Sequence, residues 1–361
     1  MLSGALRWRD HPGNRFIDDP DLRAAWDCVN AKGADTPLLA ADTVAAALRV
    51  FGRGDERILL GSCSDRPEAM LLLQPCGFGR WQTFQPSQLP LGAWVATAGL
   101  PPHELARQVL TGPLRQRALL LSLTQVDPLF TVRATECKAC SSLDYVETGW
   151  IDLDGCFDEY WAARSKNLRA NVRKQNRHLA ESGIACDLTV YRTPDEMTDA
   201  VARYGELESG GWKGREGTAV HRENDQGKFY RELLQLLATR GEAAVYELRF
   251  NGKTVASNLC LDRGNTLIVL KTAYDETVDK KYSPAILLRH AQLQTLFEGG
   301  RILRLEYYGR FREWQSQWTQ EKRMLFHLTC CRWPWLELIR RKIRCGIIHW
   351  PSRRPVDSSR A

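Results

Sequence analysis

Three apolar runs with alternating polar positions follow one another in the second half of the chain. They cover residues 243–250, 254–262 and 266–275, with Asn251-Gly252 and Gly264-Asn265 between them. Asn-Gly between alternating runs is among the strongest signals of a β-hairpin, because both residues adopt positive φ readily. The pattern therefore predicts an antiparallel meander of three strands.

Apolar positions at helical spacing surround this meander. Residues 157–182 carry such positions on one face, which indicates a long amphipathic helix or a helix pair. The helix at 284–299 has clear signals at both ends, since Ser283 is placed as N-cap and Gly299-Gly300 follows its last turn. The other expected elements are helices at 193–209 and 225–240, and strands at 184–192, 301–309 and 323–331.

The first half of the chain shows a mixed α/β pattern and no catalytic signature. The expected elements are helices at 19–31 and 43–51 and strands at 56–63, 69–76 and 118–126. Both halves mix helices with strands. With 361 residues, the chain is long enough for two domains of roughly 100–200 residues each.

The composition is that of a globular protein, with 43% hydrophobic and 26% charged residues, which excludes disordered and fibrous classes. No apolar run is long enough to span a bilayer, and the first residues lack the apolar stretch of a secretory signal. We therefore expect a cytoplasmic protein whose 11 cysteines are reduced thiols. Cys137 and Cys140 form a lone C-x-x-C pair, so no metal site is expected.

The positive charge is concentrated at the C-terminal end. Residues 1–150 have a net charge of −1, whereas residues 151–361 have +8 and residues 332–361 alone have +6. Within 333–350 apolar residues recur at helical spacing among arginines and tryptophans, which is typical of a helix on a membrane surface. A C-terminal helix docked on the core is the alternative. Residues 351–361 are expected to be disordered.

The segment between the third meander strand and the next helix is a candidate anion site. Free N–H groups of a first helical turn and the positive helix end attract anions such as phosphate. The alternative is an ordinary capped helix. The candidate binding residues are Lys280, Lys281, Ser283, Ala285, Ile286 and Arg289.

Residues 164–178 form a second basic segment, with six cations and no acid. Arg169 and Arg173 in this segment are candidates for binding a phosphorylated or lipid-linked acceptor. A solvated helix face is the alternative. Nucleic-acid binding is not favoured, because no aromatic residues interleave with the cations.

Several ordered motifs in residues 155–310 carry a family resemblance. They are Ser165–Lys174, the Trp-Lys-Gly core of 206–218, Phe229-Tyr230, Asn251-Gly252 with Val255-Ala256, Ala273-Tyr274-Asp275, and Tyr282-Ser283-Pro284. This part of the chain resembles the BioF2-like acetyltransferase domain of the CelD/BcsL-type proteins, which are GNAT acyltransferases related to FemAB transferases. Ala285 stands where that family usually has glycine, and its Asp-Phe segment is replaced by Glu306–Phe311.

The resemblance implies an α/β (α+β) fold of tandem GNAT-like domains, each a mixed, mostly antiparallel sheet flanked by helices. Residues 1–150 are then a degenerate GNAT-like domain and residues 151–331 the acyltransferase domain. Residues 332–361 are then a basic amphipathic helix with a tail.

The resemblance also implies direct transfer from acetyl-CoA or another acyl-CoA to an amine or hydroxyl of an exopolysaccharide or cell-envelope precursor. Glu306 is the first candidate base, and a half-exposed strand carboxylate is the alternative. Tyr274 is a candidate proton donor to the thiolate, or else a strand core residue. Glu208, Trp212 and Lys213 are candidates for the acceptor site, or else a packed loop.

Two other functions stay open. FemAB-like relatives use aminoacyl-tRNA as donor, in which case the basic segment at 164–178 would contact RNA. A non-catalytic GNAT-fold module that tethers a polysaccharide synthase complex to the membrane through 333–350 is the second alternative.

Overall fold

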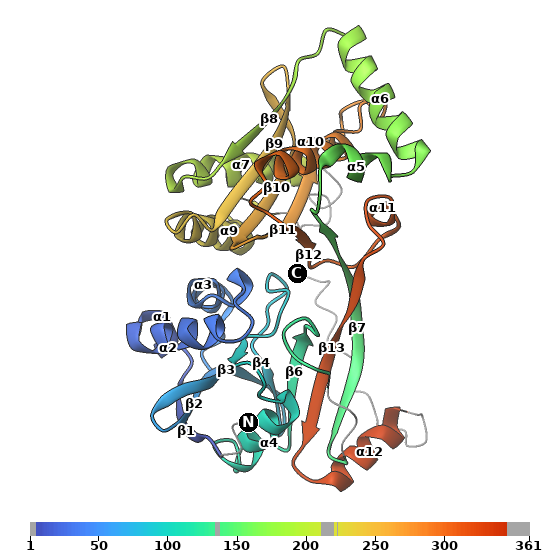
Figure 1. Cartoon of the computed structure of the whole chain (residues 1–361). Helices are drawn as coiled ribbons and strands as arrows, with labels where there is room; N and C mark the ends of the chain where they lie inside the picture. The colour runs from blue at the N-terminus through green and yellow to red at the C-terminus, as the bar shows by residue number, and fades with distance from the viewer. Residues whose placement is uncertain (1–4, 134–137, 211–219, 222, 345–361) are drawn as a thin grey trace, which may run out of the picture.

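The computed structural model describes residues 5–133, 138–210, 220–221 and 223–344. One 13-stranded sheet runs through this part of the chain (Figure 1). Its strands are β1 (Arg7–Pro12), β2 (Arg57–Cys63), β3 (Arg66–Gly77), β4 (Arg80–Thr83), β5 (Trp94–Ala96), β6 (Leu120–Val126), β7 (Cys140–Asp152), β8 (Cys186–Tyr191), β9 (Ala243–Phe250), β10 (Lys253–Arg263), β11 (Thr266–Tyr274), β12 (Arg304–Tyr307) and β13 (Lys322–Cys331).

Helices cover both faces of this sheet. They are α1 (Arg15–Asp18), α2 (Pro20–Ala31), α3 (Ala41–Phe51), α4 (Pro102–Thr111), α5 (Phe157–Ala162), α6 (Lys166–Glu181), α7 (Pro194–Gly210), α9 (Asp225–Ala238), α10 (Pro284–Gly299), α11 (Glu313–Ser316) and α12 (Pro334–Arg344), with one 3₁₀ turn, η1 (Pro37–Leu39). The predicted mixed α/β fold, with mostly antiparallel sheet flanked by helices, is thus confirmed, and the strands of the two halves are joined in one sheet.

The strand order repeats a single plan in the two halves. In one half, β1 to β4 are antiparallel neighbours, β4 pairs with β6 in parallel, and β6 pairs with β13 antiparallel. In the other half, β8 to β11 are antiparallel neighbours, β11 pairs with β12 in parallel, and β12 pairs with β7 antiparallel. The long strands β7 and β13 pair with each other and join the halves. This repetition is what a tandem arrangement predicts, while the domain limits at residues 150 and 331 stay a prediction.

Most of the predicted elements are present. The meander is β9 to β11, and residues 157–182 form a helix pair, α5 and α6, that ends before Gly183 with its positive φ of 64°. Strand β7 was not predicted from the sequence. Its 13 residues include polar positions such as Ser141 and Thr148, which are buried in the folded chain, and Ser141 is hydrogen-bonded to Arg340 of α12.

The hydrophobic core is continuous between the halves on one face of the sheet. Helix α9 packs there against both α3 and α7, so that Val44 and Leu234 share one cluster with Ile268 of β11. Helices α5, α6 and α10 cover the opposite face in the second half. The two faces of β11 and β12 therefore contact different helices and belong to different parts of the core.

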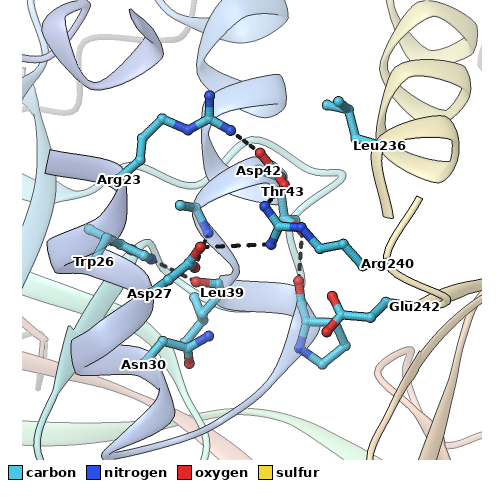
Figure 2. A network of polar contacts seen from close by, with 12 residues as sticks. Arg23, Trp26, Asp27, Asn30, Leu39, Asp42, Thr43, Leu236, Arg240 and Glu242 are labelled. Atoms are coloured by element: carbon cyan, nitrogen blue, oxygen red, sulfur yellow. Dashed lines mark hydrogen bonds and ion pairs between the residues drawn. The ribbon is translucent and has the colours of Figure 1, made fainter. Parts of the chain in front are cut away.

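A polar network reinforces the contact between α9 and the first half (Figure 2). Arg240, which follows α9, forms an ion pair with Asp42 of α3 and lies 3.8 Å from Asp27 of α2. Arg23 also pairs with Asp42, whose side chain is buried. Two arginines therefore balance one buried carboxylate where the two halves meet.

Cys140 and Cys330 lie directly opposite each other on β7 and β13 and form a disulfide. The expectation that all cysteines are reduced thiols is therefore wrong for this pair, because strand pairing brings together residues 190 positions apart in sequence. Within the described residues, no helix has the length and apolar character to cross a membrane.

Candidate functional site

The start of α10 follows β11 through a short loop, as the sequence predicts, but Ser283 does not cap it. Ser283 has a positive φ of 41°, and its hydroxyl donates to the carbonyl of Lys280 at 2.9 Å. The left-handed backbone turns the side chain back into the loop, so the predicted side-chain cap is wrong. Ile286 and Leu287 donate their N–H groups to the Ser283 carbonyl.

Several groups at the start of α10 carry a positive or partial positive charge. The N–H of Ala285 finds no acceptor in the described part of the chain. Lys280 and Lys281 are exposed just before the helix, and Lys281 Nζ lies 3.5 Å from Asp279. The free N–H, the helix dipole and the two ammonium groups all favour an anion at this end of α10.

Strands β11 and β12 separate beside this helix start. Their parallel pairing runs only from Thr266 to Val269 of β11. A bulge at Leu270 follows, since Leu259 pairs with Lys271 and Cys260 with Val269. From Leu270 to Tyr274 the edge of β11 that faces away from β10 has no strand partner among the described residues. Backbone N–H and C=O groups are therefore available along this edge.

Arg289 is buried one turn inside α10 without an acidic partner. Its guanidinium lies 3.9 Å from the ring centroid of Trp314, and Trp318 and Tyr307 complete an aromatic surround. Within the described residues it makes no ion pair, and its Nε and the hydroxyl of Tyr307 both lack hydrogen-bond partners. A buried cation is costly without a counter-charge. Arg289 is thus suited to an anionic ligand.

Glu306 of β12 is buried in a cluster of charges. Arg323 donates to both of its carboxylate oxygens, at 3.1 and 2.9 Å. The same guanidinium binds both oxygens of Asp127, and the Tyr308 hydroxyl also donates to Asp127. Burial raises the pKa of Glu306, although Arg323 opposes the shift. Glu306 is therefore not the half-exposed strand carboxylate that the alternative interpretation expected.

Glu306 and Arg289 lie on opposite faces of β12. Leu305 and Tyr307 face α10, whereas Glu306 is level with Ile268 of β11 on the other face. The anion-binding candidates and the candidate base are therefore on the two sides of the strand pair. The separation of β11 and β12 lies next to both.

Glu208 of α7 forms a third group, near the bulge of β11. It accepts hydrogen bonds from the Tyr204 hydroxyl at 3.2 Å and from the N–H of Val220 at 2.6 Å. Lys271 Nζ lies 3.7 Å from its carboxylate and 5.5 Å from the ring centroid of Tyr230. The bulge turns Lys271 toward α7. A lone strand lysine gave no signal of this role in the sequence.

The other predicted site residues are spread over the same half. Tyr274 is 45% exposed at the end of β11, so it is not a core residue. Arg169 is half-buried on α6 with its Nε bound to the Arg164 carbonyl, and Arg173 is exposed. Trp212 and Lys213 lie outside the described residues. The roles assigned to these residues stay predictions.

Two cavities adjoin the Glu306 cluster. The polar cavity has a volume of about 570 Å³. Its lining includes Asp35, Asp152, Asp154, Arg263, Arg304, Glu306 and Tyr308. The apolar cavity has a volume of about 540 Å³. Its lining includes Leu39, Leu91, Trp94, Val95, Leu100, Pro101, Pro102, Val126 and Phe130. Both volumes fall in the usual range for small-molecule sites, about 300–1,000 Å³.

In the described part of the chain, no group of three or more histidine, cysteine or acidic side chains is arranged to hold a metal ion.

Residues 166–316 match the family model of the acetyltransferase (GNAT) domain. This match, which takes in α10, β11, β12 and Glu306, supports an acyltransferase of the GNAT type.

Solved structures show the same fold over nearly the whole chain. One is the C-terminal DUF2156 domain of a protein assigned as a lysylphosphatidylglycerol synthetase from Agrobacterium fabrum. It has a TM-score of 0.52 and 12% identity, over 94% of this chain and 98% of that one. Another is a conserved protein of unknown function from Bacteroides thetaiotaomicron, with a TM-score of 0.51 and 12% identity, over 90% and 99%. Comparison with curated proteins finds no match.

Proposed function

We propose that this protein transfers an acyl group directly from an acyl-CoA thioester to an amine or hydroxyl of an acceptor. The observation that supports this most is the unpaired edge of β11, Leu270 to Tyr274, beside the positive start of α10. The pantetheine arm of CoA carries amides, which pair with a free strand edge as a peptide does. The pyrophosphate of CoA suits the anion site at Lys280, Lys281 and Ala285.

The chemistry requires no covalent enzyme intermediate. The acceptor oxygen or nitrogen attacks the thioester carbonyl, the carbon–sulfur bond breaks, and CoA leaves as the thiolate. The acceptor loses one proton and the thiolate gains one. Glu306 is the proposed base, because burial brings its pKa closer to neutrality than that of an ordinary glutamate. Tyr274, exposed at the end of the unpaired edge, is the proposed donor to the thiolate.

Arg289 and Glu208 support the same assignment from two sides. A bound acyl-CoA would supply the counter-charge that Arg289 lacks among the described residues. Glu208 and Lys271 lie on the opposite face of β11, where an acceptor would approach the thioester. The predicted acceptor contacts at Arg169, Arg173, Trp212 and Lys213 and an acceptor from polysaccharide synthesis remain part of this proposal.

The test is calorimetric titration with acetyl-CoA and longer acyl-CoA thioesters, using the matched variants Ser283→Asp and Ser283→Asn. Both replacements tolerate the left-handed backbone at this position. Only aspartate places a negative charge beside the proposed pyrophosphate site, so we expect at least tenfold weaker binding for Ser283→Asp and little change for Ser283→Asn. Absence of thioester binding to the folded wild type would refute acyl-CoA as donor, and titration with aminoacyl-tRNA would then test the FemAB-like alternative.

We also propose that α12 contacts an anionic membrane surface. Trp335 and Leu338 are 52% and 59% exposed, and the ring of Trp335 stacks on that of Trp333. Glu337 is turned inward and pairs with Arg340 and Arg341. Exposed apolar rings next to cations are suited to the interface of an anionic bilayer.

Sedimentation with lipid vesicles tests this contact. We expect binding to phosphatidylcholine vesicles that contain phosphatidylglycerol and much weaker binding to phosphatidylcholine alone. The double variant Trp335→Ser/Leu338→Ser should lose this binding. Phe78→Ser is the matched control, because Phe78 is 95% exposed on the loop between β3 and β4. Equal binding by the wild type and the double variant would contradict the proposal.

A further inference from the structure

The apolar cavity occupies, in the first half, the position that the proposed donor site has in the second half. It lies at the carboxyl ends of the parallel strands β4 and β6, where Gly92 and Val126 line it. The first residues of α4, which connects these strands, also line it. Ligands of mixed α/β sheets commonly bind at this place, outside the carboxyl ends of parallel strands.

The start of α4 beside this cavity offers no site for the phosphates of a CoA molecule, although His103 and Arg133, which pairs with Asp144, also line the cavity. Pro101 and Pro102 stand at the start of α4, and neither has an N–H to offer an anion. Leu100 precedes them, and Glu104 adds an acid in the first turn. The place of the proposed donor site in the second half is thus taken by a mostly apolar cavity in the first half.

The strand pair beside the apolar cavity is closed rather than open. The hydroxyls of Thr83 and Thr124 are hydrogen-bonded at 2.6 Å, and Thr124 donates its N–H to Thr83 Oγ1 at 3.0 Å. A side chain at Gly92 would collide with both threonines, since a Cβ there would lie 2.4 Å from Thr83 Oγ1. No ligand arm can pass between these strands, so a ligand in the apolar cavity has to extend elsewhere.

The polar cavity adjoins the apolar cavity, and such a ligand can extend into it. The two cavities share Ala34, Leu129 and Phe130 in their linings. Asp127 lines the apolar cavity and accepts the hydroxyl of Tyr308, which lines the polar one. The Glu306 cluster thus lies at the boundary between them.

The polar cavity favours a neutral or cationic group. Its lining holds four carboxylates, those of Asp35, Asp152, Asp154 and Glu306, and two guanidiniums, those of Arg263 and Arg304. Asp152 pairs with Arg304 and Asp35 with Arg263, whereas Asp154 has no ion pair among the described residues. An amine or a hydroxyl satisfies such acceptors, and an anionic group is repelled.

We infer that the two cavities together bind an amphipathic acceptor, with its apolar body in the apolar cavity and its amine or hydroxyl head in the polar cavity beside Glu306. That the bound molecule is the acyl acceptor rests on the proposed function. The binding itself does not, because neither cavity includes the α10 start. In this arrangement the first half of the chain holds the apolar body of the acceptor.

Calorimetric titration with three eight-carbon amphiphiles below their micelle concentrations tests the inference without any donor. We expect n-octyl β-D-glucoside and n-octylamine to bind and n-octyl sulfate to bind at least about tenfold more weakly. Glucose alone should not bind measurably, because the apolar cavity would stay empty. Equal affinity for all three amphiphiles, or no binding of any, would overturn the inference.

Matched variants locate the bound molecule. Leu100→Gln places a polar side chain of similar size in the half-buried wall of the apolar cavity and should weaken glucoside binding about tenfold. Phe78→Gln makes the same kind of change on an exposed loop and should have no effect. Asp154→Asn should weaken octylamine more than octyl glucoside. Unchanged affinity in Leu100→Gln, or equal effects of Asp154→Asn on both, would contradict the assigned placement.

Titration of Leu100→Gln with acetyl-CoA separates this inference from the proposed function. The variant should bind the thioester as the wild type does, since the donor residues lie on α10 and β11. If amphiphiles bind and thioesters do not, the acceptor site stands and the acyl-CoA donor is refuted. If thioesters bind and amphiphiles do not, the donor stands and the amphipathic acceptor is refuted.

Discussion

The two halves of the sheet arrange their strands alike around one parallel pair, yet the space beside that pair differs between them. In the second half, β11 continues past its pairing with β12, and its edge from Leu270 to Tyr274 has no strand partner in the described part of the chain. In the first half, Thr83 and Thr124 bind the two strands together. The same strand order therefore leaves room for the proposed donor site in one half and closes the corresponding place in the other.

The helix that connects the two strands of each parallel pair shows the same contrast. Helix α10 begins with one proline, Pro284, and has Lys280 and Lys281 before it, whereas α4 begins with Pro101 and Pro102. A change of a few side chains converts a positive helix end into an apolar wall. We conclude that the function of each half is decided by local residues at the carboxyl ends of its parallel strands.

The largest effect is expected at the residue that joins the halves. Arg323 of β13 binds Asp127 from the first half and Glu306 from the second. Arg323→Met removes the guanidinium that two buried carboxylates share, which should lower the free energy of unfolding by about 3–5 kcal/mol. Urea denaturation at neutral pH measures it. The control Arg7→Met removes an exposed pair with Asp65 and should change stability by less than about 0.5 kcal/mol. Similar effects of both would show that the halves do not depend on Arg323.

The second-largest loss of stability is expected at the strand pair β4 and β6, which Thr83 and Thr124 hold together. Thr83→Val preserves the shape of the buried side chain but removes its hydroxyl, so the N–H and hydroxyl of Thr124 lose a partner. We expect a loss of about 1–3 kcal/mol in unfolding free energy, without any change in acetyl-CoA affinity. Thr189→Val, on the edge strand β8, is the control and should cost less. A weaker affinity for acetyl-CoA in Thr83→Val would place the donor in the first half and reverse the comparison.

A smaller effect should appear in the pH dependence of stability. The pKa of Glu306 is raised above its ordinary value of 4.5, mainly by burial. The folded state then holds this proton more tightly than the unfolded state, so the wild type loses stability as pH rises from that value through the raised pKa. Glu306→Gln removes this loss, and its stability relative to the wild type should increase with pH over this window. Denaturation from about pH 4 to about pH 8 measures the trend.

Glu147→Gln is the control for this series, since Glu147 is half-exposed and pairs with Lys322 at the surface. Its stability difference from the wild type should not follow the same trend. A trend of opposite sign for Glu306→Gln would mean that Arg323 outweighs burial at this carboxylate.

The smallest effect is expected from the exposed lysines before α10. Lys280→Ala/Lys281→Ala should weaken acetyl-CoA binding by about threefold to tenfold and reduce its dependence on salt, while stability stays unchanged. The control Arg53→Ala/Arg66→Ala removes two exposed cations from the first half. Equal weakening by both double variants would assign the effect to net charge and not to the start of α10.

The sequence predicted those elements whose residues carry a local pattern. The meander follows from alternation and the Asn251-Gly252 turn, and α10 from its helical spacing and Gly300. Strand β7 was not predicted because its polar residues interrupt any apolar alternation, and it is formed through pairing with β13 and β12, which lie more than 150 residues further along the chain. The Ser283 cap was wrong because a positive φ is not visible in a Ser-Pro sequence.

The amino-acid sequence by itself determined the mixed α/β class, most of the strands and helices, and the positions of Lys280, Glu306 and Glu208 as residues of interest. Only the tertiary structure decided what these residues face. Asp127 and Arg323 lie 196 positions apart and meet Glu306 because β13 inserts between β6 and β7. Local spacing fixes secondary structure, but burial, ion pairing and cavities arise from contacts between distant segments, which single-sequence patterns do not contain.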